Sequence, residues 1–239
     1  MNLARKTVLV TGGGRRLGAA LCRALAARGC RVVIHYHRSA GPARRLARRL
    51  RARGAQAWTV GGDLSAPEAP ARVVARARAA AGRLDILVNN AAVFRPGGAL
   101  RAATADDLQA HWAVNVRAPL LLMQAFARGT RHGRVLNLLD RRVFSNRTDA
   151  AYALSKKALA ELTRLAALEL APRIAVNGVA PGPVLRADRP DTAREPAGPI
   201  PLGRRPAVRD VVAAALFLLE AESVTGQIVC VDGGQHLLG

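Results

Sequence analysis

Aromatic residues are scarce in this sequence of 239 residues, of which they make up 3%. Proteins that bind single-stranded nucleic acids stack bases on aromatic side chains, so this composition argues against such a surface. Cysteine is equally rare, and Cys22, Cys30 and Cys230 have no paired spacing that would indicate a disulfide framework or a metal site. We therefore expect no nucleic-acid partner, no metal and a reducing compartment.

Long apolar runs are also missing. No run approaches the roughly 18 residues that a membrane span requires, and the N-terminus leads directly into a predicted strand with no secretory signal before it. These absences predict a cytoplasmic protein that does not use a membrane.

Acidic residues are few, with 16 against 37 basic residues, and the formal net charge is +21. Lys6, Lys156 and Lys157 are the lysines, and the other basic residues are arginines spread along the chain without a basic tail. Such a charge can indicate binding to nucleic acid or to a membrane. The even spread instead favours solvated helix faces, with attraction of anionic small molecules as their functional consequence.

Strand-like apolar runs alternate with helix-like segments along the whole chain. Strands are predicted at residues 6–10, 31–36, 55–60, 85–89, 134–139, 174–178 and 227–231. Helices are predicted at 17–28, 41–53, 67–81, 106–127 with a kink at Pro119, 151–170 and 207–219. This alternation predicts an α/β fold of the Rossmann type, in which helices cover both faces of a doubly wound, seven-stranded parallel sheet in three αβα layers.

The chain has no linker-like stretch, so residues 1–239 are predicted to form a single domain. The segment 182–205 breaks the rhythm, because it is rich in proline, arginine and aspartate and has no periodic pattern. A loop of this length in a compact domain is usually functional. We expect it to close over a substrate.

A glycine-rich turn, TGGGRRLG at residues 11–18, joins the first predicted strand to the first predicted helix. Ligands of doubly wound sheets bind at the carboxyl ends of the strands, and the N–H groups of a helix N-terminus favour an anion there. The turn therefore predicts a phosphate site, although a simple tight connection would have a similar composition.

The second predicted strand ends with IHYHRS at residues 34–39. NAD sites usually carry an acidic residue near this point to bind the ribose 2′-hydroxyl, and this segment has none. Arg38 and Ser39 instead suit a 2′-phosphate, because guanidinium matches the geometry of phosphate. We predict NADPH rather than NADH, unless Arg38 is only a solvated surface arginine.

Two later strands are followed by residues that suit the same pocket. Asp63 follows the third strand, where its carboxylate can accept a bond from an adenine amino group. Asn89-Asn90-Ala91-Ala92 ends the fourth strand, and small residues there let the backbone approach a cofactor.

Tyr152 and Lys156 are spaced four residues apart on a predicted helix, so they share one face. A tyrosine hydroxyl has a pKa of about 10, and a nearby ammonium lowers it, which makes the pair suitable for proton transfer. By itself the pattern could equally be a surface pair on an amphipathic helix.

These motifs occur in the order Thr11–Gly18, Asp63-Leu64, Asn89-Asn90-Ala91, Asn115, Tyr152 with Lys156, Pro181-Gly182 and residues 231–234. In this order they resemble the short-chain dehydrogenase/reductase family over essentially the whole chain. The resemblance implies that Tyr152 is the proton donor, that Lys156 lowers its pKa and binds the nicotinamide ribose, and that Asn115 holds a water in a proton relay. It also implies a homotetramer.

Two departures from the family pattern are informative. Arg16 stands where the family usually has glycine, and Asp140 stands where it usually has serine, one residue closer to Tyr152 than expected. Leu139, at the usual spacing, cannot form the hydrogen bond, and Ser145 lies too close to Tyr152 to replace the missing serine. Together with HYHRS, these departures resemble pteridine reductases, including bacterial dihydromonapterin and dihydrofolate reductases. In that branch an aromatic residue matching Phe94 stacks on the pterin ring.

The sequence thus predicts an NADPH-dependent reductase of the C=N bond of a dihydropterin or dihydrofolate. The alternatives are a generic NADPH-dependent carbonyl or 3-oxoacyl reductase and a non-catalytic NADPH-binding protein. Asp140 could instead form a salt bridge with Arg141, Arg142 or Arg147, and Phe94 could be a core residue.

The predicted catalytic residues are Asn115, Asp140, Tyr152 and Lys156. The predicted cofactor-binding residues are Thr11, Gly12, Gly14, Arg15, Arg16, Leu17, Gly18, His37, Arg38, Ser39, Asp63, Leu64, Asn90, Ala91, Tyr152, Lys156, Pro181, Gly182 and Val184. The predicted substrate-binding residues are Arg16, Phe94, Asp140, Tyr152, Pro183 and Leu185.

Overall fold

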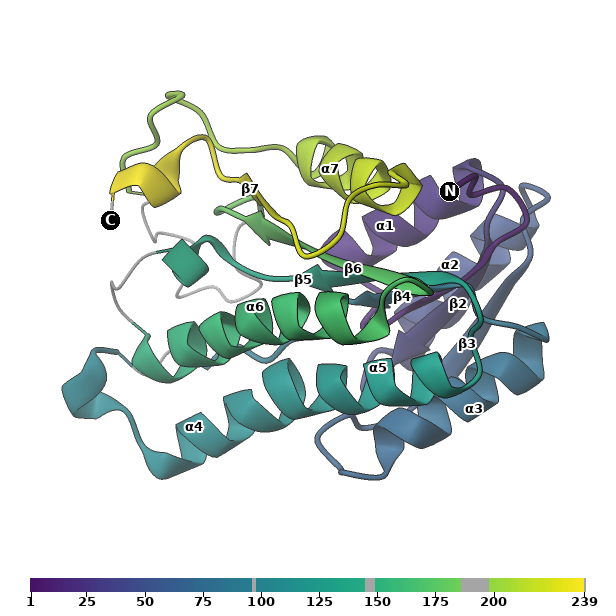
Figure 1. Ribbon diagram of the computed structural model, residues 1–239, viewed down its shortest axis with the longest axis horizontal. Coiled ribbons are helices and arrows are strands. Elements are labelled where there is room, and N and C mark those ends of the chain that lie inside the picture. The colour runs from purple at the N-terminus through teal and green to yellow at the C-terminus, as the bar shows by residue number, and fades with distance from the viewer. Residues whose placement is uncertain (96–97, 145–148, 186–197, 239) are drawn as a thin grey trace.

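The computed structural model describes residues 1–95, 98–144, 149–185 and 198–238. Within them the apolar runs form one seven-stranded sheet in the order β3-β2-β1-β4-β5-β6-β7, with every neighbouring pair parallel (Figure 1). The strands are β1 Thr7–Val10, β2 Arg31–Tyr36, β3 Ala57–Gly61, β4 Ile86–Asn89, β5 Gly133–Leu138, β6 Ile174–Pro181 and β7 Ile228–Val231. The predicted doubly wound sheet is confirmed.

Helices cover both faces of the sheet (Figure 1). On one face lie α1 Arg16–Ala27, α2 Ala40–Arg51 and α7 Val208–Glu220. On the other lie α3 Ala69–Ala81, α4 Ala105–Trp112, α5 Ala118–Arg128 and α6 Ala150–Leu170. Three short 3₁₀ turns among the described residues are η1 Leu100–Ala102, η3 Arg141–Phe144 and η4 Gln235–Leu238.

Strand β1 illustrates why three successive residues, Val8, Leu9 and Val10, are all apolar. Val8 and Val10 pack in the cluster under α1, α2 and α7, whereas Leu9 packs in the cluster under α3, α5 and α6. Successive side chains of a strand point to opposite faces, and both faces are covered here. All three side chains are therefore fully buried.

The predicted helix over residues 106–127 is interrupted. A π-helical turn, Ala113–Arg117, separates α4 from α5, and Pro119 lies in the first turn of α5. Proline has no N–H to donate to the carbonyl four residues before it, which here belongs to Asn115. The wider π-helical turn contains Asn115, whose carbonyl lacks this bond. The helix is therefore interrupted before Pro119 rather than kinked at it.

Strand β6 is longer than predicted, because it continues from Gly178 to Pro181. Its added residues pair with β7, with Ala180 beside Cys230 and Pro181 beside Val231. None of the described helices is long and apolar enough to cross a membrane. Of the loop predicted at 182–205, residues 186–197 lie outside the described part of the chain, as does Ser145.

Candidate active site

The glycine-rich turn after β1 is packed too tightly for side chains at two positions. A Cβ atom on Gly18 would lie 2.5 Å from the Gly12 carbonyl oxygen. Gly12 has a φ of +60°, and a Cβ atom there would lie 3.1 Å from the Cα atom of Ala91. Helix α1 then begins at Arg16 with no capping side chain and no acidic residue in its first turn. This open helix N-terminus fits the phosphate of a dinucleotide.

Arg16 adopts a φ of +51°, which is the left-handed region. The family glycine that it replaces enters this region without penalty, whereas other residues pay about 1–2 kcal/mol. Arg15 has an extended backbone, and the side chain of Leu17 packs on the core. Strain of this kind is retained mostly at functional sites, so it draws attention to the arginine side chain.

Thr11 and Asn90 hold the turn against the end of β4. The Thr11 hydroxyl donates to the Val88 carbonyl and accepts the N–H groups of Asn90 and Ala91. The Asn90 side-chain amide donates to the Thr11 and Gly12 carbonyls, at 2.7 and 3.2 Å. Both side chains are thus engaged within the protein, and they shape the predicted cofactor site rather than project into it.

His35, on β2, binds this turn, a role that the sequence did not predict. Its Nδ1 atom accepts the Gly12 N–H at 3.2 Å, which leaves Nε2 to donate to the Gly62 carbonyl at 3.1 Å. Burial lowers the pKa of His35 to about 4, so the ring is neutral at neutral pH. It ties the glycine-rich turn to the end of β3. A histidine inside a strand that is buried on both faces needs hydrogen-bond partners, and this was the signal in the sequence that could have indicated its role.

Beyond β2, the side chains predicted to bind the adenosine end are exposed or partly exposed. The Nε2 atom of His37 lies 3.6 Å from Asp63 Oδ2, and Arg38 is exposed beside them. Asp63 accepts the N–H and O–H of Ser65, and these hydrogen bonds lower the pKa of its carboxyl. The end of β2 has no acidic residue at the place where NAD sites usually carry one. The predicted contact through Leu64 cannot involve its side chain, which is buried.

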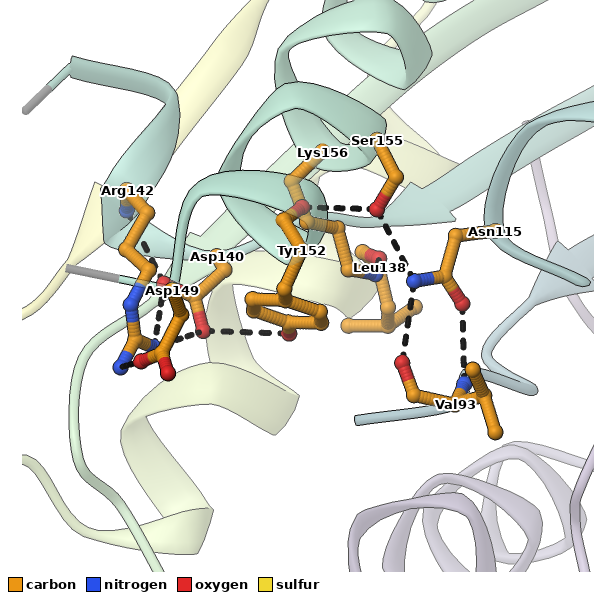
Figure 2. Close-up of polar contacts among 9 residues, drawn as sticks. All are labelled: Val93, Asn115, Leu138, Asp140, Arg142, Asp149, Tyr152, Ser155 and Lys156. Atoms are coloured by element: carbon orange, nitrogen blue, oxygen red, sulfur yellow. Dashed lines mark hydrogen bonds and ion pairs between the residues drawn. The ribbon is translucent and has the colours of Figure 1, made fainter. Parts of the chain in front are cut away.

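Tyr152 lies on the first turn of α6 and faces Asp140, which follows β5. The Tyr152 hydroxyl donates to Asp140 Oδ2 at 3.3 Å (Figure 2). The ring of Phe94 meets the Tyr152 ring edge to face, with centroids 4.8 Å apart and planes at 75°. Phe94 is 40% exposed, so it is not a core residue. The structure therefore brings together the predicted acid, carboxylate and aromatic side chain.

Asp140 also makes the salt bridge that the sequence left open. Arg142 Nη1 lies 3.5 and 3.4 Å from its two carboxylate oxygens, and the Arg142 backbone N–H donates to Oδ1 at 2.9 Å. Arg142 Nη2 lies 3.0 Å from Asp149, the residue that precedes α6 (Figure 2). The carboxylate of Asp140 thus contacts Tyr152 and Arg142 at the same time.

The electrostatics around Tyr152 differ from what the family resemblance implies. Burial and the Asp140 carboxylate raise the pKa of Tyr152 well above its ordinary value, and the cation that opposes them is Arg142. Lys156 is buried, donates to the Leu138 carbonyl at 2.8 Å and has its own pKa lowered by burial to about 8. Its ammonium lies 5.8 Å from the centre of the Tyr152 ring.

Asn115 fixes the segment that carries Phe94. Its amide donates to the Val93 carbonyl and the Ser155 hydroxyl, both at 3.0 Å, and its oxygen accepts the Val93 N–H at 2.9 Å (Figure 2). The side chain is therefore fully engaged in joining this segment to α6. The predicted contact of Asn115 with a relay water cannot use its side-chain N–H groups.

The carboxyl end of β6 brings the last predicted site residues beside the end of β7. Gly182 donates to the Val231 carbonyl at 3.0 Å, and a Cβ atom on it would lie 2.8 Å from the Cα atom of Asp232. Val184 packs partly on the core, whereas Leu185 is 37% exposed. Pro183 lies between them and is partly exposed.

Comparisons with known proteins agree with this geometry. A family described as enoyl-(acyl carrier protein) reductase matches residues 14–236. Pteridine reductase 1 of Leishmania tarentolae is 35% identical, and the match covers 96% of each chain.

Solved structures are similar over nearly the whole chain. The FolM alternative dihydrofolate reductase 1 of Brucella canis, complexed with NADP, has a TM-score of 0.92 and 36% identity over 99% of this chain and 96% of its own. A short-chain dehydrogenase of Burkholderia cenocepacia, also with NADP, has a TM-score of 0.87 and 35% identity over 98% of each chain. The chain therefore belongs to the short-chain dehydrogenase/reductase family of oxidoreductases.

Proposed function

We propose that this protein is an NADPH-dependent reductase that acts on the C=N bond of a pterin, such as a dihydropterin or dihydrofolate. The observation that carries the proposal is the Asp140 carboxylate at 3.3 Å from the Tyr152 hydroxyl, with the partly exposed Phe94 ring against the Tyr152 ring. A pterin presents a row of N–H donors, which a carboxylate accepts better than the usual serine does.

The cofactor assignment rests on the turn after β1 and on the end of β2. The open N-terminus of α1 would take the pyrophosphate, and Arg38 would take the 2′-phosphate. The NADP-bound structures from Brucella canis and Burkholderia cenocepacia support this choice. When bound, NADPH would supply the hydride.

The protein's own groups would manage the substrate and the proton. The Tyr152 hydroxyl, whose pKa burial and Asp140 raise, is protonated at neutral pH and would give its proton to the ring nitrogen that gains negative charge. Asp140 would accept substrate N–H groups and hold the ring in register, and Phe94 would contact its face. Lys156 would bind the nicotinamide ribose once its ammonium leaves the Leu138 carbonyl.

A second candidate is a carbonyl or 3-oxoacyl reductase. The Asp140–Arg142 ion pair favours it, because a carboxylate held by a guanidinium could be structural and leave Tyr152 to protonate a carbonyl oxygen. The family description, enoyl-(acyl carrier protein) reductase, is also compatible with an acyl substrate.

The experiment that separates the two follows NADPH oxidation with dihydrobiopterin, dihydromonapterin, dihydrofolate, a simple ketone and a 3-oxoacyl thioester. The variant Asp140→Ser restores the usual family residue. We expect it to lose about ten- to a hundredfold in pterin kcat/KM, the equivalent of one charged hydrogen bond, with no matching loss on a ketone. Asp106→Ser, at an exposed carboxylate on α4, is the control and should change neither activity.

If ketones or acyl thioesters are reduced and pterins are not, the pterin assignment is rejected in favour of the second candidate. NADPH binding without turnover of any substrate would indicate a non-catalytic NADPH-binding protein.

A further inference from the structure

Arg142 lies at the centre of the candidate site, although the sequence suggested it only as one possible ion-pair partner. The carbon of its guanidinium lies 5.5 Å from the centres of the Phe94 and Tyr152 rings. Its two terminal nitrogens contact different carboxylates, Nη1 that of Asp140 and Nη2 that of Asp149 (Figure 2). One side chain therefore lies beside Asp140, Tyr152 and Phe94 at once.

The contacts of Arg142 suit arginine and no other residue. A planar guanidinium can bind two carboxylates in fixed directions while its faces lie against aromatic rings, which a lysine ammonium cannot do. The Arg142 side chain is only 17% exposed, so its contacts with Asp140 and Asp149 are shielded from water. Removing it would take this cation away from two partly buried carboxylates, one of which accepts the Tyr152 hydroxyl.

Tyr152 is surrounded by charged and titratable groups from several elements. Asp140 and Asp149 raise the pKa of the tyrosine, and Arg142 lowers it. Lys156 donates to the Leu138 carbonyl, and the ring of His111, 5.7 Å away, is bonded to the Asp107 carbonyl and the Arg95 N–H. Among the described residues, the charged and titratable groups that face Tyr152 are Asp140 after β5, Arg142 on η3, Asp149 before α6, Lys156 on α6 and His111 on α4.

We propose that Arg142 is a positioning residue for the proton transfer: it holds the Asp140 carboxylate at the Tyr152 hydroxyl and supplies the positive charge beside that hydroxyl. This inference rests on the proposed function, in which Tyr152 gives the proton. It assigns to Arg142 the electrostatic role that the family resemblance assigns to Lys156. Arg142 itself acts through Asp140 and Tyr152 and does not react.

Tyrosine titration tests this role without any substrate. The chain has two tyrosines, so Tyr36→Phe leaves Tyr152 as the one whose ionisation changes the ultraviolet absorbance. In that background Asp149→Asn removes a negative charge, and asparagine tolerates the left-handed backbone of position 149, where φ is +53°. We expect the Tyr152 midpoint to fall by about one pH unit.

Adding Arg142→Met to that variant should raise the Tyr152 midpoint again by about one unit or more, because the opposing cation is lost. Arg141→Met in the same background is the matched control, since it removes an arginine from the same turn, and it should leave the midpoint unchanged. Circular dichroism on the same samples limits the comparison to folded protein. Where unfolding precedes ionisation, the basic limb of the kcat profile with any accepted substrate gives the same comparison.

In the otherwise native chain, Arg142→Met should lower kcat about tenfold or more, whereas Arg141→Met should leave it nearly unchanged. The inference is overturned if Arg142→Met does not raise the midpoint, or if Arg141→Met raises it equally. If pterins are not reduced but the Tyr152 midpoint responds to Arg142→Met, only the proposed substrate is rejected. If pterins are reduced but the Tyr152 midpoint does not respond, only the role of Arg142 is rejected.

Discussion

Lys156→Met should produce an inactive protein that is more stable than the wild type at neutral pH. Burial lowers the pKa of Lys156 from its ordinary value to about 8. Each unit of such a shift corresponds to about 1.4 kcal/mol, so the buried charge costs about 3 kcal/mol of unfolding free energy at neutral pH. Losing the bond to the Leu138 carbonyl would offset about 1 kcal/mol of the gain.

The size of this stability difference must depend on pH. The folded state disfavours the charged lysine, so the penalty is fully present below the folded pKa near 8. It disappears as the pH rises toward the pKa of an unfolded lysine, about 10.4, where the wild type keeps only its favourable hydrogen bond. The predicted advantage of about 2 kcal/mol for Lys156→Met should therefore vanish in alkaline solution.

Urea unfolding of both proteins at about pH 7 and at about pH 10 measures this difference. Lys157→Met is the matched control, because its side chain is partly exposed on the same helix, and it should change stability by less than about 0.5 kcal/mol. A Lys156→Met protein that is less stable than the wild type at neutral pH would refute the reasoning. So would a difference that does not shrink as the pH rises.

The remaining predictions concern two arginines of the cofactor site. Arg38→Ala should raise the KM for NADPH about tenfold or more and leave the KM for NADH nearly unchanged, since only NADPH carries the 2′-phosphate. Steady-state kinetics with both cofactors would contradict the assignment if the two values rose equally. Arg16→Gly should raise the unfolding free energy by about 0.5–1 kcal/mol, because glycine adopts the φ of +51° without penalty, while pterin turnover falls. Arg15→Gly, at an extended position, should lower stability instead, and the same outcome for both variants would show that left-handed strain is not what distinguishes Arg16.

The fold could be predicted because strong local signals agreed with it. Continuous apolar runs such as residues 86–88 occur where helices cover both faces of a sheet, and glycines marked the helix ends at 29, 54 and 82. The predicted strand ended at Gly178, yet β6 continues to Pro181. Pairing with β7 gives those residues a partner that is far away in the sequence.

The site could be predicted in its members but not in its electrostatics. Asp140, Tyr152 and Phe94 were found by spacing and resemblance, and the structure brings them together. That Arg142 opposes the raised pKa of Tyr152 depends on the exact path of η3 and on the burial of the whole cluster. Neither the path of η3 nor the burial of the cluster leaves a periodic pattern in the sequence. The only guide to the cation beside Tyr152 was therefore the family resemblance, which indicated Lys156.

The most direct test of the proposed function is a crystal structure of the protein with NADP⁺ and a dihydropterin. The account predicts that the pterin ring lies against Phe94, with its N–H groups on the Asp140 carboxylate and its reducible nitrogen within hydrogen-bonding distance of the Tyr152 hydroxyl. A pterin bound away from Asp140, with that carboxylate engaged by Arg142 alone, would contradict it.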